Sequence, residues 1–463
     1  MLSTTESVSP TAPAKSRRRR TALSRVAAET SGLVALAAPL VAGLMGGSLL
    51  SVVDSYMLGP LGEAPLAACS LTQSVLVIFY AALYGLTSPI SVLVGQAYAA
   101  GELSRISAIR RHGLAIGIAG GLVAAVAMSA ILALLPYSGQ PENVVAILPA
   151  YWLAMSAALV PFTLQMVLKQ VCDAIERPWT GAFFTILPVA VNVPLNWALI
   201  YGHWGAPKLG LLGAGLGSLG ALTVGLVAMV GYFRFAKSMA PYRGSTRFTF
   251  ASIAELTRHG TPMSVQYLAE SSAVAIAGVL IGLLGATALA ANQIVFSIGV
   301  LIYMVPLGMA GAVTIRIAQA IGECSWPRVR AIGIAGVAVV TIWMAAFSAA
   351  MVLFGQEIAH AFIDDPHVVA LAATMFVAVG VMQVFDGLQS VSLGALRGML
   401  DNDWPMRVSL IAYWLVALPL SVVFGFVLGF GATGVWAGFG AGLAVAGVLL
   451  THRFLKLTSG AFN

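Results

Sequence analysis

Charge is scarce in this sequence. Asp, Glu, Lys and Arg make up only 9% of its 463 residues, whereas 59% are hydrophobic. A soluble domain usually carries about 25% charged residues, because a chain of this length needs a charged surface to stay dispersed in water. The shortage therefore excludes a soluble enzyme or binding protein and indicates a chain that is solvated mainly by lipid.

Cysteine and histidine are also few, and they are scattered. The three cysteines, Cys69, Cys172 and Cys324, lie far apart in the chain. The six histidines fall at the edges of apolar stretches or between them, and they never cluster. This pattern argues against a disulfide framework and against a metal centre built from Cys or His.

Long apolar stretches dominate what is present. Twelve of them reach the roughly 20 residues that a helix needs to cross hydrocarbon. Their approximate bounds are 33–57, 66–88, 113–135, 148–168, 179–201, 211–233, 259–283, 288–312, 332–354, 369–393, 408–428 and 433–452. The sequence therefore predicts an all-α membrane protein with twelve transmembrane helices.

The basic residues alternate with these stretches and predict the orientation. With the N-terminus inside, 23 of the 24 Lys and Arg residues fall in the N-terminal arm, the even-numbered connections and the tail, and only Lys208 falls outside. Because Lys and Arg accumulate on the cytoplasmic side, we expect a multi-pass protein of the inner (plasma) membrane with both termini in the cytoplasm. The run Arg17–Arg20 is expected to contact anionic membrane lipids and not nucleic acid.

The chain contains an internal duplication with an offset of 223 residues. The segment Leu61–Ala68 matches Leu284–Ala291, and Pro39 falls on Pro262. Six spans per repeat preserve orientation, so the halves are parallel repeats, a plan in which the substrate site lies between the halves near the membrane midplane. The predicted parts are a basic arm 1–30, an N-terminal six-helix lobe 31–235, a cytoplasmic linker 236–258, a C-terminal six-helix lobe 259–455 and a tail 456–463.

Three of the 17 acidic residues lie inside the apolar stretches, namely Asp54, Glu270 and Asp386. A charge at the bilayer centre costs at least about 2.5–3.5 kcal/mol, and such residues usually mark ion or substrate pathways. No Lys or Arg is placed by the sequence deep enough to neutralise them, so each acid is expected to be protonated, hydrated or bound to a cation. The alternative for each acid is a structural hydrogen bond between helices.

Polar and aromatic residues in the same spans would complete a cavity. Amide and hydroxyl oxygens near Glu270 and Asp386 suit Na⁺, but a buried acid pair equally suits a proton, and the sequence does not choose between them. Tyrosines suit a pocket for planar cations and asparagines suit a polar cavity, although either residue type could instead serve packing between helices. The cavity candidates are Asn192, Asn196, Gln266, Tyr267, Asn292, Gln293, Gln383, Tyr80, Tyr84 and Tyr303.

Four ordered motifs resemble the multidrug and toxic compound extrusion (MATE) family. They are Val53–Gly59 with Leu66–Ala68, Val191–Trp197, Leu289–Ile294 and Gly394–Gly398, within a resemblance that runs from about residue 30 to 455. The resemblance implies two six-helix lobes forming a V, and export of drugs or metabolites driven by entry of Na⁺ or H⁺. It also implies that Glu270 and Asp386 match the cation-site acids of the bacterial NorM-type branch. Asp54 matches the first-span aspartate of that branch, while Asn292 stands where a histidine is common.

The expected function is therefore antiport by a monomeric exporter that is not an enzyme. Its partners would be small cationic organic molecules and membrane lipids, with Na⁺ or H⁺ as the coupling ion and no other cofactor. A narrow-substrate metabolite exporter is the nearest variant of this function.

Three other functions fit the sequence less well. A flippase for lipid-linked precursors would need buried Lys or Arg in its cavity to hold a pyrophosphate, and the sequence shows none. A prenyl transferase would need paired acidic motifs for Mg²⁺, but only Asp364 and Asp365 are adjacent, in an expected external loop. A channel would repeat a selectivity element, whereas Ala277 is the repeat equivalent of Asp54.

Overall fold

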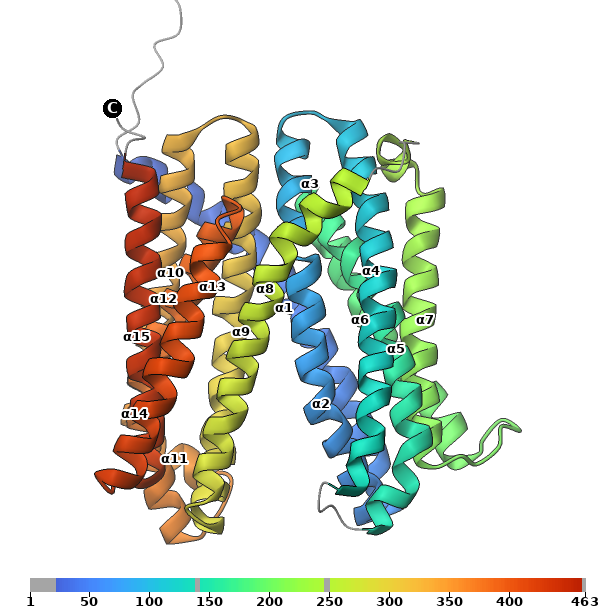
Figure 1. Ribbon diagram of the computed structural model, residues 1–463, viewed down its shortest axis with the longest axis vertical. Helices are drawn as coiled ribbons and strands as arrows, with labels where there is room; N and C mark the ends of the chain where they lie inside the picture. The colour runs from blue at the N-terminus through green and yellow to red at the C-terminus, as the bar shows by residue number, and fades with distance from the viewer. Residues whose placement is uncertain (1–21, 138–141, 245–249, 460–463) are drawn as a thin grey trace, which may run out of the picture.

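The computed structural model describes residues 22–137, 142–244 and 250–459, and these residues are almost entirely helical (Figure 1). Twelve helical segments are long and apolar enough to cross a membrane. They form two bundles that stand side by side and splay apart toward one end (Figure 1). The predicted all-α membrane fold with two six-helix lobes in a V is confirmed. The run Arg17–Arg20 and Arg247, one of the basic residues assigned to the even-numbered connections, lie outside the described residues.

The first bundle, called the N-lobe, contains α1 to α7. Its helices are α1 (Ala22–Leu58), α2 (Glu63–Thr87), α3 (Pro89–Ala99), α4 (Leu103–Ile131), α5 (Glu142–Ala174), α6 (Pro178–Tyr201) and α7 (Leu211–Phe235). Short 3₁₀ turns follow α1, α4 and α7. Helices α2 and α3 form one continuous span that is interrupted only around Ser88. Pro89 begins α3, a position where its missing N–H costs no helical hydrogen bond.

The second bundle, called the C-lobe, contains α8 to α15. Its helices are α8 (Phe250–Gly282), α9 (Ala286–Gly322), α10 (Trp326–Leu353), α11 (Gly355–His360), α12 (Pro366–Gly398), α13 (Asp403–Leu410), α14 (Leu418–Val422) and α15 (Gly431–Thr458). Two π-helical segments, Ile411–Ala417 and Val423–Val427, flank α14 and complete one span with α13. Pro419 lies in α14 and has no N–H to donate, which is one reason for a local departure from α-helical bonding.

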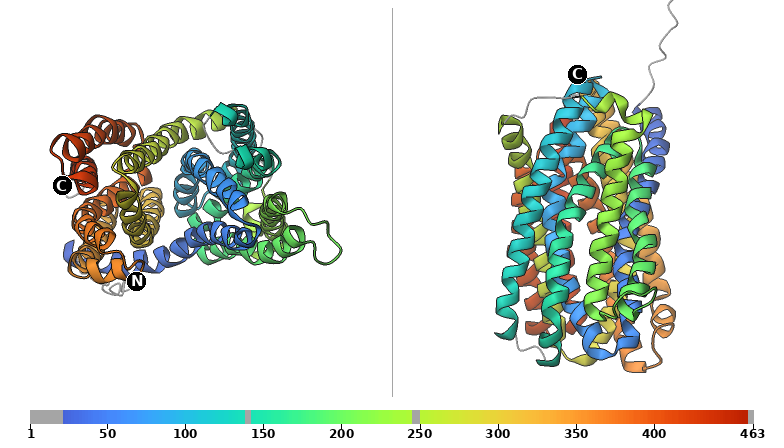
Figure 2. Two further views of the ribbon diagram at one scale, coloured as in Figure 1. Left: turned by 90° about the horizontal axis from the view of Figure 1, so that it is seen from below. Right: turned by 90° about the vertical axis from the view of Figure 1, so that its right-hand side faces the viewer.

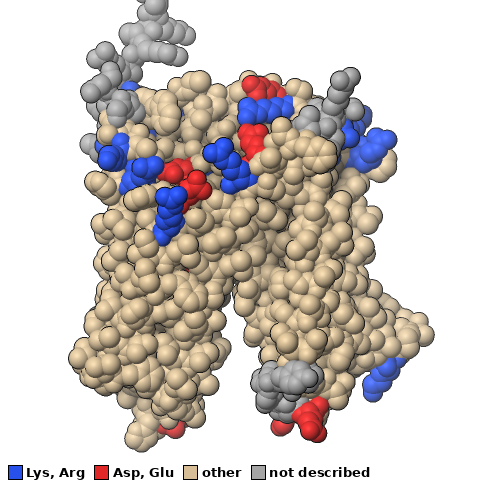
Figure 3. All heavy atoms as spheres, viewed as in Figure 1, with Lys and Arg blue, Asp and Glu red and all other residues tan. Residues whose placement is uncertain are grey.

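Lysine and arginine side chains gather at one end of the molecule, called here the basic end (Figure 3). A cleft between the lobes opens at the opposite end (Figure 3). Several helices run further toward the basic end than hydropathy predicts, so that α5, α9 and α12 reach Ala174, Gly322 and Gly398. The basic residues Lys169, Arg316 and Arg397, expected in connections, therefore lie inside helices, because their charges had lowered the hydropathy and ended the predicted spans early.

The two repeats meet in symmetric contacts where the lobes touch. A Cβ on Gly85 of α2 would lie 2.6 Å from the Ser264 backbone nitrogen of α8, and a Cβ on Gly308 of α9 would lie 3.2 Å from the Val41 backbone nitrogen of α1. Gly85 and Gly308 are 223 residues apart in the chain, and so are Val41 and Ser264. Close approach of backbones at small residues is how helices pack in lipid. The duplication thus builds the same lobe-to-lobe contact twice.

Helices α1 and α8 tie the lobes together by crossing between them (Figure 2). Leu33, Leu36 and Leu40 of α1 belong to the hydrophobic core of the C-lobe. Leu256 of α8 belongs to a core cluster of the N-lobe. The first half of each helix therefore packs against the opposite lobe, and this exchange brings residues of both lobes to one central cavity.

Candidate functional site

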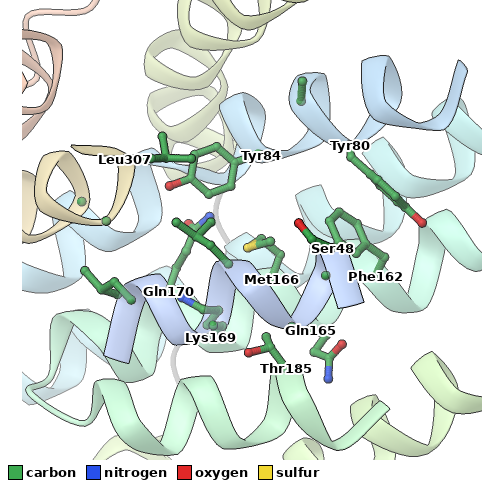
Figure 4. A pocket seen from close by; sticks show the side chains of 18 of the residues that line it. Ser48, Tyr80, Tyr84, Phe162, Gln165, Met166, Lys169, Gln170, Thr185 and Leu307 are labelled. Carbon is green, nitrogen blue, oxygen red and sulfur yellow. The ribbon is translucent and has the colours of Figure 1, made fainter. Parts of the chain in front are cut away.

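A cavity of about 610 Å³ lies at the junction of the lobes. Helices α1, α2, α3, α5 and α6 provide most of its wall, and α7, α8, α9 and α12 provide the rest. Among the cavity candidates named from the sequence, Tyr80, Tyr84 and Tyr267 line it. The Tyr80 ring lies 4.1 Å from that of Phe162 (Figure 4), and the rings of Tyr84 and Tyr267 meet edge to face across the lobes at 5.4 Å. The site is therefore aromatic and shared between the lobes.

Two basic residues line the same cavity, which corrects the sequence interpretation. Lys169 of α5 and Arg397 of α12 are each only 8% exposed, and both border the cavity. The expectation that no Lys or Arg lies deep enough to act on the buried acids, or inside the cavity, was wrong. It failed because these residues were assigned to connections when they lie on the last turns of long helices. The argument against a flippase that binds pyrophosphate depended on the same expected lack of Lys and Arg in the cavity, so it no longer holds.

Lys169 has an acidic partner within its own helix. Its Nζ lies 2.6 Å from Oδ2 of Asp173, which is 4% exposed and also lines the cavity. Residues four apart lie on the same face of a helix, so the spacing of Lys169 and Asp173 was a signal that sequence reasoning missed. Asp173 Oδ1 has no hydrogen-bond partner among the described residues. The pair therefore neutralises its own charge and leaves one free acceptor atom.

Arg397 is held by neutral groups. Its Nη1 donates to the Tyr267 hydroxyl at 2.7 Å and its Nη2 donates to Gln266 Oε1 at 3.2 Å. The guanidinium carbon lies 4.6 Å from the centre of the Tyr267 ring, a cation–π distance. No carboxylate of the described residues forms a salt bridge with Arg397, and its Nε has no hydrogen-bond partner there.

Glu270 of α8 and Asp386 of α12 form an acid pair inside the C-lobe. Both side chains are half-buried, and the two carboxyl groups interact electrostatically. Glu270 lies near the Tyr413 hydroxyl, which accepts from Gln389 Nε2 at 2.7 Å. Glu270 also interacts with Arg397 at longer range. Arg397 and Tyr267 thus connect the acid pair to the cavity, although neither acid lines it.

Three of the four remaining candidates in the C-lobe join helices by hydrogen bonds. Asn292 accepts a hydrogen bond from Trp436 Nε1 at 2.8 Å, and Gln383 donates to the Gly299 carbonyl at 3.0 Å. Tyr303 donates to Ser390 at 3.4 Å and lies within electrostatic reach of both acids. Gln293 is exposed. None of these four borders the cavity.

Asp54 belongs to a separate polar cluster in the N-lobe. Its fully buried carboxyl group accepts hydrogen bonds from Asn196 Nδ2 at 2.7 Å and from Ser218 Oγ at 2.6 Å. Asn192 donates to Ser218 Oγ at 3.0 Å and accepts from Asn196 Nδ2 at 3.0 Å. Sequence reasoning named Asp54, Asn192 and Asn196 but missed Ser218, because a serine in an apolar span carries no distinctive signal. The cluster does not border the cavity.

The lobes contact each other closely at the basic end. Arg316 of α9 lies 3.6 Å from Glu176, which follows α5, and Gln319 Nε2 donates to the Ala174 carbonyl at 3.2 Å. Arg328 of α10 bridges to Glu29 of α1 at 2.9 Å. These polar contacts join the lobes at the basic end, whereas the opposite end is hollowed by the cleft (Figure 3). The structure is thus open toward one side only.

The donor sets favour a monovalent cation or a proton over a transition metal. Within the described ranges, no three His, Cys, Asp or Glu side chains come together as metal ligands. Glu270, Asp386 and the Tyr413 hydroxyl offer only oxygen atoms, which suit a hard cation.

Comparison with known proteins agrees with this arrangement. The MatE family model matches residues 39–198 and again 262–423, and the two matches begin at the repeat-equivalent prolines Pro39 and Pro262. A probable multidrug resistance protein NorM of Synechococcus sp. is 32% identical over 444 residues, covering 94% of this chain and 96% of the relative. A relative of the same name from Rhizobium meliloti is 31% identical, and the match covers 91% of this chain and 92% of the relative.

Solved structures share the fold. The Vibrio cholerae MATE transporter VcmN in its bent form has a TM-score of 0.84 at 18% identity, over 94% of this chain and 98% of that one. An outward-facing multidrug resistance MATE family transporter has a TM-score of 0.84 at 19% identity, over 94% of this chain and 97% of that one. The repeat, the twelve spans and these matches over nearly the whole chain lead to one assignment. The chain belongs to the multidrug and toxic compound extrusion (MATE) family, and within it to the NorM-like members, which are transporters and not enzymes.

Proposed function

We propose that this protein exports small cationic organic molecules across the inner membrane in exchange for Na⁺ or H⁺, by alternating access. The observation that carries the proposal is the aromatic cavity between the lobes, linked through Tyr267 and Arg397 to the acid pair Glu270–Asp386. A volume of about 610 Å³ falls in the range of sites for drug-sized molecules. The names of the NorM relatives support an organic substrate.

The basic end faces the cytoplasm in this proposal, because Lys and Arg accumulate on that side. The connection between α6 and α7, which holds Lys208, then lies outside, and both termini lie inside. With the lobes joined at the basic end and the cleft at the other (Figure 3), the conformation is outward-facing. Export requires a second conformation in which the contacts at the basic end separate.

Coupling follows from differential affinity, since a ligand shifts a two-state equilibrium only by binding one state better. A cation or proton taken up by Glu270 and Asp386 removes negative charge beside the cavity. This change weakens the hold on a cationic substrate and favours its release outward. Asp54, whose partners Asn196 and Ser218 are neutral, is proposed as a second coupling residue in the N-lobe.

Efflux of ethidium from cells tests the proposal. Wild type, Glu270→Gln and Glu255→Gln would be compared at several Na⁺ concentrations and pH values. Glu255 is an exposed acid on the same helix and serves as the matched control. We expect wild type and Glu255→Gln to export the dye and Glu270→Gln to fail, with the Na⁺ or pH dependence identifying the ion. A folded wild type that exports no cationic dye under any condition would overturn the proposal.

A further inference from the structure

The connection between α6 and α7, residues 202–210 and called here the outer loop, is an ordered turn with a strained backbone. Backbone hydrogen bonds fasten it to the last turns of α6, among them the bond from Leu209 N to the Leu199 carbonyl at 2.9 Å. Trp204 nevertheless has a φ of 57°, in a region where a bulky residue is a genuine outlier. Strain of this kind persists where the surrounding structure enforces it, and it often marks a functional position.

The strained residue belongs to an aromatic cluster at the base of the outer loop. The Trp197 ring of α6 stacks on the His203 ring at 3.9 Å, and the Trp204 ring meets Trp197 edge to face at 5.2 Å. The cluster leaves its outermost ring open, because Trp204 is 75% exposed. Tryptophan combines a large apolar surface with one N–H donor, and it concentrates where a membrane meets water. The cluster therefore has the composition of a membrane-interface contact.

The outer loop lies where it can reach that interface. It projects sideways from the N-lobe, away from the C-lobe, near the end opposite the basic end (Figure 1 and Figure 2). A loop that projects along the membrane plane lies over the lipids next to the protein, whereas a loop that continues the helix axes would stand in water. In the proposed orientation these lipids are those of the outer leaflet.

Lys208 supplies a positive charge in the same loop. It is exposed, and it forms no ion pair among the described residues. Its backbone nitrogen would lie 3.2 Å from a Cβ on Gly202, whose φ is 81°, so a glycine at that position lets Lys208 fold back next to His203. Lys208 is also the one Lys or Arg assigned to the outside, against the usual preference of basic residues for the cytoplasmic side. Its charge complements an anionic headgroup.

We propose that the outer loop binds an anionic phospholipid of the outer leaflet. Lys208 binds the headgroup phosphate, and Trp204 and Trp197 pack against the glycerol backbone and the first carbons of the acyl chains. A zwitterionic lipid presents a competing ammonium group beside its phosphate, so it binds less well than phosphatidylglycerol. The inference depends on the proposed orientation and not on the exported substrate, so binding and export are tested separately.

Fluorescence quenching at the outer loop tests the inference. A bimane label is attached to Ala206→Cys in a Cys324→Ser background, since Cys69 and Cys172 are buried. The full-length protein is placed in nanodiscs of phosphatidylcholine that contain a fraction of spin-labelled lipid, either phosphatidylglycerol or phosphatidylcholine, with the nitroxide near the headgroup end of the chains. We expect both lipids to quench, with phosphatidylglycerol favoured by about fivefold, the attraction of one lysine to an anionic surface.

Variants separate recognition from structure. Lys208→Gln should lose the preference for phosphatidylglycerol, and Lys208→Arg should keep it. Lys237→Gln removes an exposed lysine that follows α7 at the basic end and should change nothing at the outer loop. Trp204→Gly removes the side chain but suits the left-handed backbone. Quenching by both lipids should therefore fall in Trp204→Gly, while the thermal unfolding midpoint stays close to that of wild type.

Three results would overturn the inference. Equal quenching by the two lipids in wild type, or a preference that survives in Lys208→Gln, would show that Lys208 selects no headgroup. Absence of quenching by either lipid would place the outer loop in water and leave a protein partner as the occupant of the aromatic cluster. Efflux of ethidium is measured separately. A protein that prefers phosphatidylglycerol at the outer loop but exports no dye contradicts the proposed export and leaves the lipid site in place.

Discussion

In the N-lobe the buried acid Asp54 is surrounded by neutral donors, whereas in the C-lobe Glu270 and Asp386 interact with each other and lie near Arg397. The lobes descend from one repeated sequence and share their helix order. The residue equivalent to Glu270 at the 223-residue offset is Gly47, which lines the cavity. Duplication therefore preserved the backbone contacts between the lobes while the polar chemistry diverged within them.

The comparison teaches that the two acid sites are constrained differently. Asp54 is fully buried, and three neutral side chains surround it, so a substitution there changes both the ionisable group and the packing around it. Glu270 and Asp386 are half-buried, so they can exchange a cation with less effect on the fold. Transport and stability measured on the same variants distinguish these roles.

The largest effect is expected at the acid pair. Glu270→Gln and Asp386→Asn each remove a carboxylate from the coupling site, and efflux should fall to that of cells without the protein. The thermal unfolding midpoint should change little, because neither acid forms an ion pair among the described residues. A large fall in the midpoint would show that the pair is structural.

The next largest effect is expected at the symmetric glycines. Gly85→Leu and Gly308→Leu each force a side chain into backbone of the opposite lobe, so the lobes are pushed apart at this contact and transport should be lost. Because the two contacts are repeat equivalents, the two variants should behave alike. Gly278→Leu, where a Cβ meets nothing within 4 Å, is the control. Spin-label distances between the lobes at the basic end would measure the opening, and unchanged distances would contradict the symmetric closure.

A moderate effect on stability is expected at the N-lobe cluster. Asp54→Asn places an amide donor against Asn196 and Ser218, both of which donate to the present carboxyl group. Leaving buried donors unsatisfied costs about 1–3 kcal/mol, so the unfolding midpoint should fall more than in Glu270→Gln. The unfolding midpoint of Ser218→Ala, which removes one donor, should fall less than that of Asp54→Asn. If Asp54→Asn unfolds like wild type, the distinction between the two lobes is wrong.

The smallest effect is expected at the ion pair between Arg316 and Glu176. Its atoms are 3.6 Å apart and the glutamate side chain is 53% exposed, so the pair contributes no more than about 1 kcal/mol. Arg316→Gln should shift the lobes away from the outward-facing state and change the transport rate by less than about fivefold. Complete loss of transport would mean that this pair contributes far more to the closed basic end than its exposure and its distance indicate.

The sequence predicted the fold well because membrane spans leave a strong local signal. Twelve apolar stretches, the alternation of Lys and Arg, and the repeat that pairs Pro39 with Pro262 each depend on residue type along the chain. Helix ends were less predictable. Lys169 and Arg397 were assigned to connections because hydropathy falls at a charge, even when the helix continues and the side chain is buried.

The candidate site was only partly predictable from residue type. An acid in an apolar span is conspicuous, so Asp54, Glu270 and Asp386 could be named, and Tyr80, Tyr84 and Tyr267 do line the cavity. Asn292 and Gln383 have the same polarity but join helices. A polar side chain looks alike in sequence whether it faces a neighbouring helix or a cavity.

By itself the sequence determined the twelve spans, the duplication and the three buried acids, because transfer of each segment or charge into lipid depends on local composition. Only the tertiary structure decided which charges share a cavity. The crossing of α1 and α8 between the lobes, and the length of α5 and α12, bring Lys169, Asp173 and Arg397 to one cavity. Such contacts join helices far apart in the chain, so their geometry depends on packing and not on the pattern of any one segment.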